Sequence, residues 1–425
     1  MASMRKQYVC AATVAALIAG GGGATAAQAA SQAPRASAGG AVYTETNAPD
    51  RNEVIAFRRG ADGRLHRLGT YATGGKGTGE FENTDSMVVV GSSAGQSSPV
   101  DLGGGQALLF AANPGSDDIS VFRIHRDGRL RLVARAKTGE ERPTSLTVRN
   151  GLLYAMNSAG DSNPGVAFCL GGEPTITGFR VSATGRLARI PDSTRRLSTG
   201  AGSGCTQITF NPAGNVLLVS QFTSNRIDAF TIGADGRPSA APVPNPSNGL
   251  GPFGLNFDNE GRLLTTDDGL ARVGQGAVAT YAVGGDGHLS PIGAPVPNGE
   301  TDTCWIIPTP DDRYAFVTSF GPEPFLTAPP LARRGTVSSY RLRDDGTMQL
   351  RHGVAARLGV GAADIAMTRD GRYLYALNTI QGTVTGWRIA RGGGLVRVSQ
   401  VHGIPTNRPG PMSGGLAAWD RSARR

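Results

Sequence analysis

Two aspartates and one arginine are the residues of this sequence whose types and positions could carry out hydrolysis. Asp302 and Asp364 stand at or just before apolar segments that read as strands, and Arg142 holds a similar place earlier in the chain. A carboxylate there can activate water, and a guanidinium can bind an oxyanion or an anionic substrate. The competing interpretation is structural: the aspartates cap turns or pair with arginines, and Arg142 is solvated beside Glu140 and Glu141.

Three further residues near the same strand starts could bind a ligand. Gln207 could orient a polar group of the substrate, and Phe253 and Trp305 could form an apolar wall beside it. Each has a structural alternative, in which Gln207 bonds the backbone of a neighbouring strand and the two rings pack in the core. Both interpretations stay open at the level of sequence.

The cysteines predict one disulfide and one free thiol. Cys169 and Cys205 are expected on the same face of adjacent repeat units, where they could bridge in an oxidising compartment if their Cα atoms lie within about 7 Å. Cys304 is expected to be buried and free, as a structural thiol rather than a nucleophile. The spacings match no zinc motif, no phosphate loop and no dinucleotide fingerprint, so no metal and no cofactor is expected.

The elements that would position these residues follow from composition. Glycine supplies 62 and proline 26 of the 425 residues, and this glycine content is about twice the average of ~7%. Each interior glycine costs a helix roughly 1 kcal/mol, which argues against a mainly helical protein. Glycine shows no three-residue period, and a hydrophobic content of 39% is enough to build a core. A turn-rich, all-β protein remains.

Three elements recur seven times in a fixed order: an apolar strand ending in a small polar residue, an alternating strand ending in an aromatic residue, and a turn glycine six residues later. The first strands are 43–47, 109–113, 153–157, 217–221, 263–267, 315–319 and 374–378. The aromatic residues are Phe57, Phe122, Phe179, Phe230, Tyr281, Tyr340 and Trp387. The turn glycines are Gly63, Gly128, Gly185, Gly236, Gly287, Gly346 and Gly393.

A further strand precedes the first element in five of the units. These inner strands are expected at 145–148, 207–210, 254–257, 305–308 and 364–367. The D-G strings are typical of tight hairpins, so each unit should be a four-stranded blade, and seven blades predict an all-β, seven-bladed β-propeller. The first unit lacks an inner strand and residues 415–419 lack an outer partner, so the C-terminal strand should close the ring within a propeller spanning 41–420.

The repeated Y-x-x-x-N strand with its D-G-x-L turn resembles the YVTN-type propellers of the 6-phosphogluconolactonase-like family, which includes fungal carboxymuconate-lactonizing enzymes. The resemblance covers nearly the whole chain after its first 40 residues and implies a hydrolase that opens a lactone at the channel mouth. The alternative is a non-catalytic propeller that binds a small anionic ligand, a glycan or a protein. A purely structural scaffold is the least favoured interpretation, because three loops expected on one rim of the propeller are unusually long.

That rim is marked by long connections between the second and third strands of three units, at 158–174, 268–276 and 320–335. They should share a face with the starts of the inner strands, where elaborate loops on a rigid scaffold usually bind ligands. Tolerated surface insertion is the alternative.

The sequence departs from the family at its histidines. Active members carry a Pro-His type motif at inner-strand starts, whereas this chain has Pro143-Thr144 and Pro252-Phe253 there. The five histidines fall in outer strands or beside D-G turns, so a histidine mechanism does not transfer. They are His66, His125, His288, His352 and His402.

The N-terminus is typical of a secretory signal peptide. Arg5 and Lys6 precede an apolar run over 9–18, and Ala27-Gln28-Ala29 predicts cleavage after Ala29. We therefore expect a secreted, extracellular protein with a flexible lead-in over 30–40 and a basic tail over 421–425. The formal charge of +9 comes from scattered arginines without a basic helix or a stacking motif. A monomer that binds a small molecule or a glycan is expected, with neither a nucleic-acid partner nor a membrane span.

Overall fold

The computed structural model describes most of the chain after residue 38. The described residues are 39–80, 82, 87–90, 107–160, 169, 171–321, 335–359, 361–406 and 413–421. The chain divides into two units, and all described residues belong to the second, Ala36–Arg425. The predicted signal peptide lies outside the described residues, as do residues 30–38 of the lead-in and 422–425 of the tail. No helix in the described part is long and apolar enough to cross a membrane.

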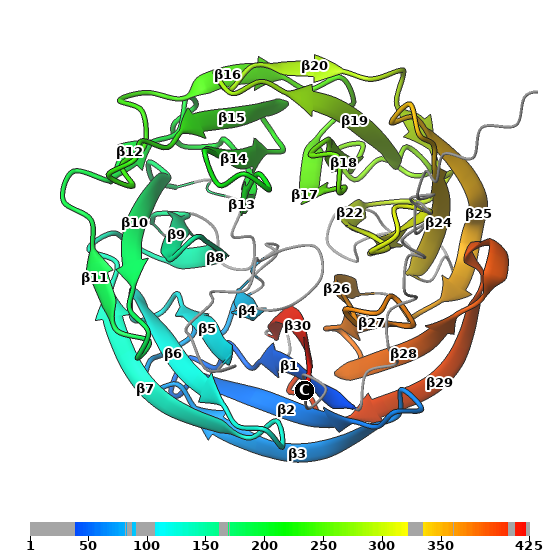
Figure 1. Ribbon diagram of the computed structural model, residues 1–425, viewed down its shortest axis with the longest axis horizontal. Coiled ribbons are helices and arrows are strands. Elements are labelled where there is room, and N and C mark those ends of the chain that lie inside the picture. Colours follow the sequence, from blue (N-terminus) through cyan, green and yellow to red (C-terminus); the bar gives the residue numbers. More distant parts are fainter. Residues whose placement is uncertain are drawn as a thin grey trace, which may run out of the picture. The chain divides into compact units, whose positions relative to one another are not determined.

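These residues form seven antiparallel blades around a central channel, as the sequence predicts (Figure 1). Blade one contains β30 (Gly414–Asp420), β1 (Gly40–Glu45), β2 (Glu53–Arg59) and β3 (Leu65–Ala72). Blade two contains β4 (Val88–Val90), β5 (Ala107–Asn113), β6 (Asp118–Ile124) and β7 (Leu130–Lys137). Blade three contains β8 (Pro143–Arg149), β9 (Leu152–Asn157), β10 (Thr175–Val181), β11 (Leu187–Arg189) and β12 (Arg195–Arg196).

The other four blades repeat this order from the channel outward. Blade four contains β13 (Cys205–Phe210), β14 (Val216–Gln221), β15 (Arg226–Thr231) and β16 (Val243–Pro246). Blade five contains β17 (Pro252–Phe257), β18 (Leu263–Asp267), β19 (Ala277–Val283), β20 (Leu289–Pro291) and β21 (Val296–Pro297). Blade six contains β22 (Thr303–Pro308), β23 (Tyr314–Ser319), β24 (Thr336–Leu342) and β25 (Met348–Arg357). Blade seven contains β26 (Ala362–Met367), β27 (Tyr373–Asn378), β28 (Thr383–Ile389), the short 3-10 turn η1 (Arg391–Gly393) and β29 (Leu395–His402).

The ring closes as the unequal ends of the sequence predict. β30 pairs antiparallel with β1, with Val42 opposite Ala418 and Ala41 opposite Trp419. The C-terminal strand is thus the inner strand of blade one (Figure 1). Closure pairs the inner edge of β1, which would otherwise be an exposed strand edge and a site for aggregation.

The outer strands of blades three and five differ from the simple four-stranded repeat, because each is broken in two. The break in blade three contains Pro191 and Asp192, whose φ is 56°, and the break in blade five contains Gly293 at φ 73°. Proline cannot donate to a strand ladder, and a positive φ turns the chain out of the sheet. β12 and β21 then rejoin the same neighbours, β10 and β19.

The seven predicted turn glycines all take positive φ, between 78° and 90°. Only glycine adopts this region without a steric cost, which explains the strict six-residue spacing. At Gly63 there is a second reason, because a Cβ would lie 2.3 Å from the ring of Tyr373 in blade seven.

The tyrosine of the repeated second strand joins neighbouring blades. In three blades its hydroxyl donates to the carbonyl of the turn glycine in the next blade, at 2.6–2.8 Å. The pairs are Tyr43 with Gly128, Tyr154 with Gly236 and Tyr375 with Gly63. The tyrosine of this repeated strand therefore encodes an inter-blade bond, and the last pair joins blade seven to blade one.

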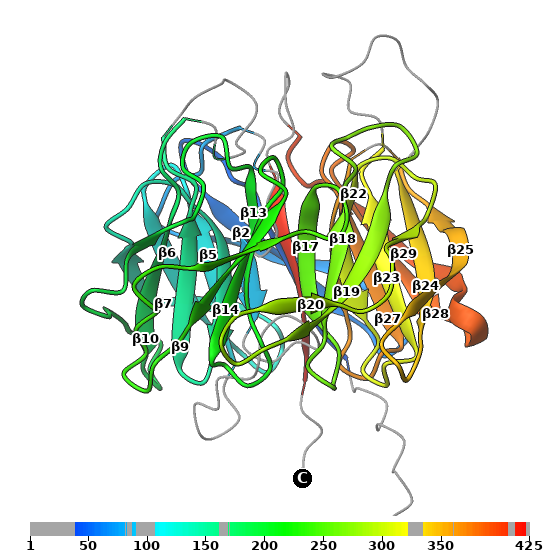
Figure 2. The same cartoon turned by 90° about the horizontal axis from the view of Figure 1, so that it is seen from above.

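The hydrophobic core lies between the faces of adjacent blades rather than at one centre. Leu264 and Val278 of blade five, for example, pack with Ile306 and Val317 of blade six. Figure 2 shows the blades edge-on, with loops gathered at the two rims of the ring. The channel rim is therefore built by loop residues held on a rigid scaffold.

Candidate functional site

The residue just before the inner strand takes the same strained conformation in five blades. Its φ is positive, between 57° and 105°, and its carbonyl accepts an N–H from the residue that follows the second strand of that blade. The strained residues are Arg142, Gly204, Gly251, Asp302 and Gly361. Their donors are Ser158, Phe222, Asp268, Phe320 and Thr379. Three blades use glycine at this rim position, and two use a charged residue.

A side chain at such a position has an energetic cost. For a residue other than glycine the left-handed conformation costs roughly 1–2 kcal/mol, and strain of this kind is concentrated at functional sites. Arg142 and Asp302 are two of the three catalytic residues that the sequence predicts. Their conformation marks both as unusual positions, because glycine would satisfy the backbone equally well.

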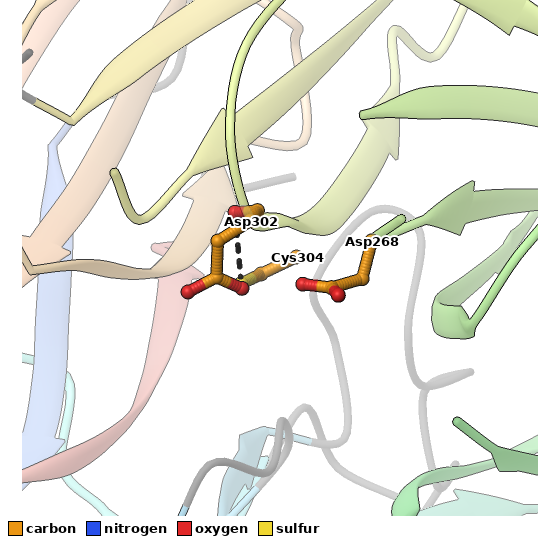
Figure 3. A group of neighbouring side chains, drawn as sticks. All are labelled: Asp268, Asp302 and Cys304. Atoms are coloured by element: carbon orange, nitrogen blue, oxygen red, sulfur yellow. Dashed lines mark hydrogen bonds between the residues drawn. The ribbon is translucent and has the colours of Figure 1, made fainter. Parts of the chain in front are cut away.

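Asp302 lies beside Asp268 and Cys304 at the boundary of blades five and six (Figure 3). One oxygen of each carboxyl and the Cys304 sulfur all lie within 4.8 Å of one another. The Cys304 thiol donates to Oδ1 of Asp302 at 3.2 Å. Two buried carboxyls this close repel each other when both are ionised, which favours a proton on one of them.

Burial governs the electrostatics of this pair. Asp268 is 1% and Asp302 is 2% exposed. Burial raises the pKa of Asp268, and the bonds from Asp302 and from the backbone N–H groups of Ala271 and Leu270 partly offset the increase. Such a pair titrates as one unit, in which a shared proton and a negative charge coexist. Two carboxylates and a thiol also offer three ligand atoms to a cation, although Oδ1 of Asp302 already accepts the Cys304 thiol.

Asp364 has different partners. Its Oδ1 accepts the backbone N–H of Ile365 and its Oδ2 accepts that of Leu416 in β30, both at 2.6 Å. The side chain is 1% exposed. The carboxylate therefore ties the inner strand of blade seven to the closing strand of blade one, which matches the structural interpretation better than that of a catalytic base.

Gln207 follows the same pattern. Its Oε1 accepts the N–H of Leu255 in the inner strand of blade five at 2.5 Å. Ser145 accepts an N–H from the next inner strand in the same way, and the Asn256 amide donates to the carbonyl of Ile306 at 3.0 Å. Gln207 thus belongs to a series of inner-strand side chains that bond neighbouring blades.

Arg142 is buried among carboxylates rather than solvated. Its Nη2 lies 2.9 Å from Oε1 of Glu82 and also contacts Glu80. Burial raises the pKa of Glu82, and the Arg142 charge opposes that increase. The guanidinium is already neutralised by these two acids, which leaves it poorly suited to bind an anionic substrate.

Phe253 and Trp305 lie in the core between blades. Their ring centroids are 4.9 Å apart, and Phe222 packs on Phe253 edge-to-face at 5.6 Å. Each of Phe253 and Trp305 is 1% exposed. These contacts correspond to the packing alternative.

The cysteines lie as the sequence suggests. Cys169 and Cys205 are joined in the structure with their Cα atoms 5.6 Å apart, inside the range that a disulfide requires. Cys304 is buried and free of any disulfide. Three of the histidines fall in outer strands, His66 in β3, His352 in β25 and His402 in β29. The family's histidine chemistry therefore does not apply at the described rim.

Sequence reasoning missed Asp268. It is the first residue of the 268–276 insertion and directly follows another acid, Asp267, at the end of β18. Two consecutive acids at a strand end that opens a long rim loop would have been the signal. The structure thus brings Asp302 together with Asp268, while Arg142 and Asp364 take part in other networks.

Comparison with solved structures shows which proteins share this fold. A proposed 6-phosphogluconolactonase from Bacteroides uniformis aligns over 90% of this chain and 100% of its own, at 17% identity and TM-score 0.64. A periplasmic gluconolactonase from Pseudomonas aeruginosa aligns over 89% and 99%, at 15% identity and TM-score 0.58. A hypothetical selenium-binding protein from Sulfolobus tokodaii aligns over 91% and 95%, at 12% identity and TM-score 0.56.

These likenesses show the seven-bladed propeller fold. No protein-family model and no curated protein sequence matches the chain. Since proteins with different names share the fold, the activity has to be argued from the site.

Proposed function

We propose that this protein hydrolyses a lactone and that the Asp268–Asp302 pair is its acid–base centre. The observation that carries the proposal is a pair of buried carboxyls within 4.8 Å of each other at the channel rim, one of them at a backbone position with positive φ. The lactonase-like fold supports the same class of reaction. Secretion belongs to the proposal as well, on the strength of the signal-peptide pattern of the sequence alone.

The pair can supply both proton transfers of hydrolysis. The ionised member accepts a proton from water as the water oxygen bonds to the lactone carbonyl carbon. The protonated member then donates to the ring oxygen as the C–O bond of the ring breaks, giving a hydroxy acid. The thiol of Cys304 holds the carboxyl of Asp302 in orientation through its 3.2 Å bond.

An uncharged lactone suits this rim better than a phosphorylated one. Arg142, the cation that the sequence suggests for an anionic substrate, is engaged by Glu80 and Glu82. Asp268 and Asp302 add one negative charge while they share a proton. A phosphate group brought to these residues would meet net repulsion.

The second candidate is a non-catalytic propeller that binds a small molecule, a glycan or a protein. The burial of the pair favours it, because carboxyls that are 1% and 2% exposed can also serve only to join blades five and six. The same variants decide between the two functions.

The test is a screen of uncharged γ- and δ-lactones, with proton release followed in a pH-stat. Asp302→Asn and Asp268→Asn should each lower kcat at least 100-fold, since general acid–base catalysis contributes about 10²–10⁴-fold. Asp312→Asn is the matched control, because Asp312 has a similar positive φ of 52° in the turn between β22 and β23. Hydrolysis that survives Asp302→Asn, or its absence from the folded wild-type protein across the screen, would reject the proposal.

A further inference from the structure

In blades two to seven the second strand ends on a polar residue at one shared position. Five of these residues are neutral amides or a hydroxyl, and blade five alone has an acid. The residues are Asn113, Asn157, Gln221, Asp267, Ser319 and Asn378. Asp267 is thus an ionisable residue in a place that the repeat otherwise fills with neutral ones.

Most of the neutral side chains donate hydrogen bonds from this position. The amide of Asn113 donates to Ser120 at 2.8 Å, that of Asn157 to Thr177 at 3.2 Å, and that of Asn378 to the carbonyl of Gly359 at 2.5 Å. An ionised carboxylate cannot donate, so only a protonated Asp267 can imitate these residues.

Asp267 has no hydrogen-bond partner among the described residues. It is 2% exposed, and neither carboxyl oxygen is bonded. The carboxyl packs directly on the segment 247–251, which leads from β16 to β17. A Cβ added at Gly249 would lie 1.9 Å from one of its oxygens. The Asp267 carboxyl is therefore in close contact with this segment. A neutral carboxyl is better accommodated in such a buried contact than a charged one.

The charged form of Asp267 is disfavoured by its surroundings. Burial and then the negative charge of Asp268 raise its pKa to about 7. Burial and then the negative charge of Asp267 raise the pKa of Tyr281 in β19 and of Tyr340 in β24, and no ion pair of the described residues involves Asp267. Nothing described on the elements around it compensates a negative charge.

We infer that Asp267 is a pH-dependent latch on the 247–251 segment, closed when its carboxyl is neutral and loosened when it ionises. The latch acts on the candidate site through two backbone bonds. Gly251 accepts the N–H of Asp268 at 2.8 Å, and Leu250 accepts that of Gly269 at 2.9 Å. Loosening 247–251 therefore frees the start of the 268–276 insertion, which carries Asp268.

The sign of the effect follows from the two protonation states. The folded protein holds the Asp267 proton up to about pH 7, whereas the unfolded chain releases it near the ordinary value of about 3.9. Stability is therefore highest below pH 4, falls as the pH rises from 4 to 7, and levels off above that. Between pH 4 and pH 7, ionisation of Asp267 alone should increase the equilibrium constant for unfolding on the order of a thousandfold.

The first measurement is amide exchange of peptides covering 247–251, corrected for intrinsic rates, at pH 5.5 and 8.5. In the wild-type protein, protection should fall at least tenfold between the two pH values. Asp267→Asn should remove that fall, because the variant carries the residue type found at this position in three other blades. Asn157→Asp is the matched control: it should leave 247–251 unchanged and add pH sensitivity to blade three instead.

The second measurement is the urea midpoint of the same proteins across pH 4–8. Other buried carboxyls also contribute to the slope, so the difference between wild type and Asp267→Asn is the readout. The urea midpoint of Asp267→Asn should exceed that of the wild type by an amount that grows as the pH rises. Equal slopes, or protection of 247–251 that does not change with pH in the wild type, would overturn the latch. Neither measurement depends on lactone hydrolysis, so the two proposals fail separately.

Discussion

The buried polar side chains of the inner strands and the channel rim are of two kinds, which differ in the groups that form hydrogen bonds with them. Gln207 and Asp364 accept backbone N–H groups of the next inner strand. Asp268 and Asp302 instead lie beside each other, bonded to a loop N–H and to the Cys304 thiol, and Arg142 is bonded to acidic side chains. Both kinds are polar or charged residues near the channel. We therefore use the hydrogen-bond partner of each side chain to distinguish a structural role from a chemical one.

The difference has an energetic basis. A side chain that satisfies a backbone amide replaces water at a group that the fold must bury anyway, and this stabilises the ring. Charged side chains that interact mainly with other charged side chains must also lose water when the protein folds. This desolvation cost offsets most of their mutual attraction, so they add little to the stability of the ring. Residues of the second kind are therefore expected where the chain is selected for chemistry.

The largest effect is expected for Arg142→Met, which removes one member of a buried charge cluster. Glu82, whose side chain is 1% exposed, would lose the guanidinium 2.9 Å away. Breaking a buried ion pair in this way costs about 3–5 kcal/mol, measurable as a lower urea midpoint. Adding Glu82→Gln should recover part of the loss, because the remaining partner is then uncharged. A double variant no more stable than Arg142→Met would contradict this account.

A smaller effect is expected for Asp364→Ala, which breaks the first kind of contact. The amides of Ile365 and Leu416 would be left buried without their acceptor. At about 1–2 kcal/mol for each of these two unsatisfied groups, the free energy of unfolding should fall by roughly 2–4 kcal/mol. Lactone hydrolysis per folded molecule should stay unchanged, whereas Asp302→Asn should show the reverse pattern. If Asp364→Ala lost activity while keeping its stability, the division into two kinds would fail.

Gln207→Ala should cost less, because only one amide loses its acceptor. The N–H of Leu255 would stay buried between blades four and five, at an expected cost of about 1–2 kcal/mol. Gln207→Glu is the matched variant, since it keeps an oxygen in place and should retain most of the bond at low pH. Thermal unfolding of both variants at pH 4.5 checks the ranking.

The sequence predicts the fold almost completely, because the signals that encode it are local and repeated. The turn glycines specify hairpins through their own φ, and the unequal chain ends specify closure by β30. The strands that the sequence predicts less well are those in which the repeated pattern is weak. The inner strand of blade two, β4, spans only Val88–Val90, and two outer strands are broken by proline and positive φ.

The candidate site is predicted only in part, because its partners are distant in sequence. Arg142 meets Glu82 across 60 positions, and Asp268 meets Asp302 from the neighbouring blade. The rule that rim residues before inner strands carry chemistry identifies Arg142 and Asp302 correctly as unusual positions. It cannot tell that Asp364 is occupied by backbone amides, since those lie in β26 and β30.

The smallest effect isolates the strain at Asp302, where φ is 57°. Asp302→Ala removes the carboxyl and keeps a Cβ in the left-handed region, whereas Asp302→Gly removes both. The glycine variant should therefore be more stable than the alanine variant by about 1 kcal/mol, the reverse of the usual order inside a strand. Ala362, within β26, supplies the control, because Ala362→Gly should lower stability by roughly 0.5–1 kcal/mol. If Asp302→Gly were the less stable of the two, the carboxyl pair would be held by an unstrained backbone, and the rim position would lose its claim to be functional.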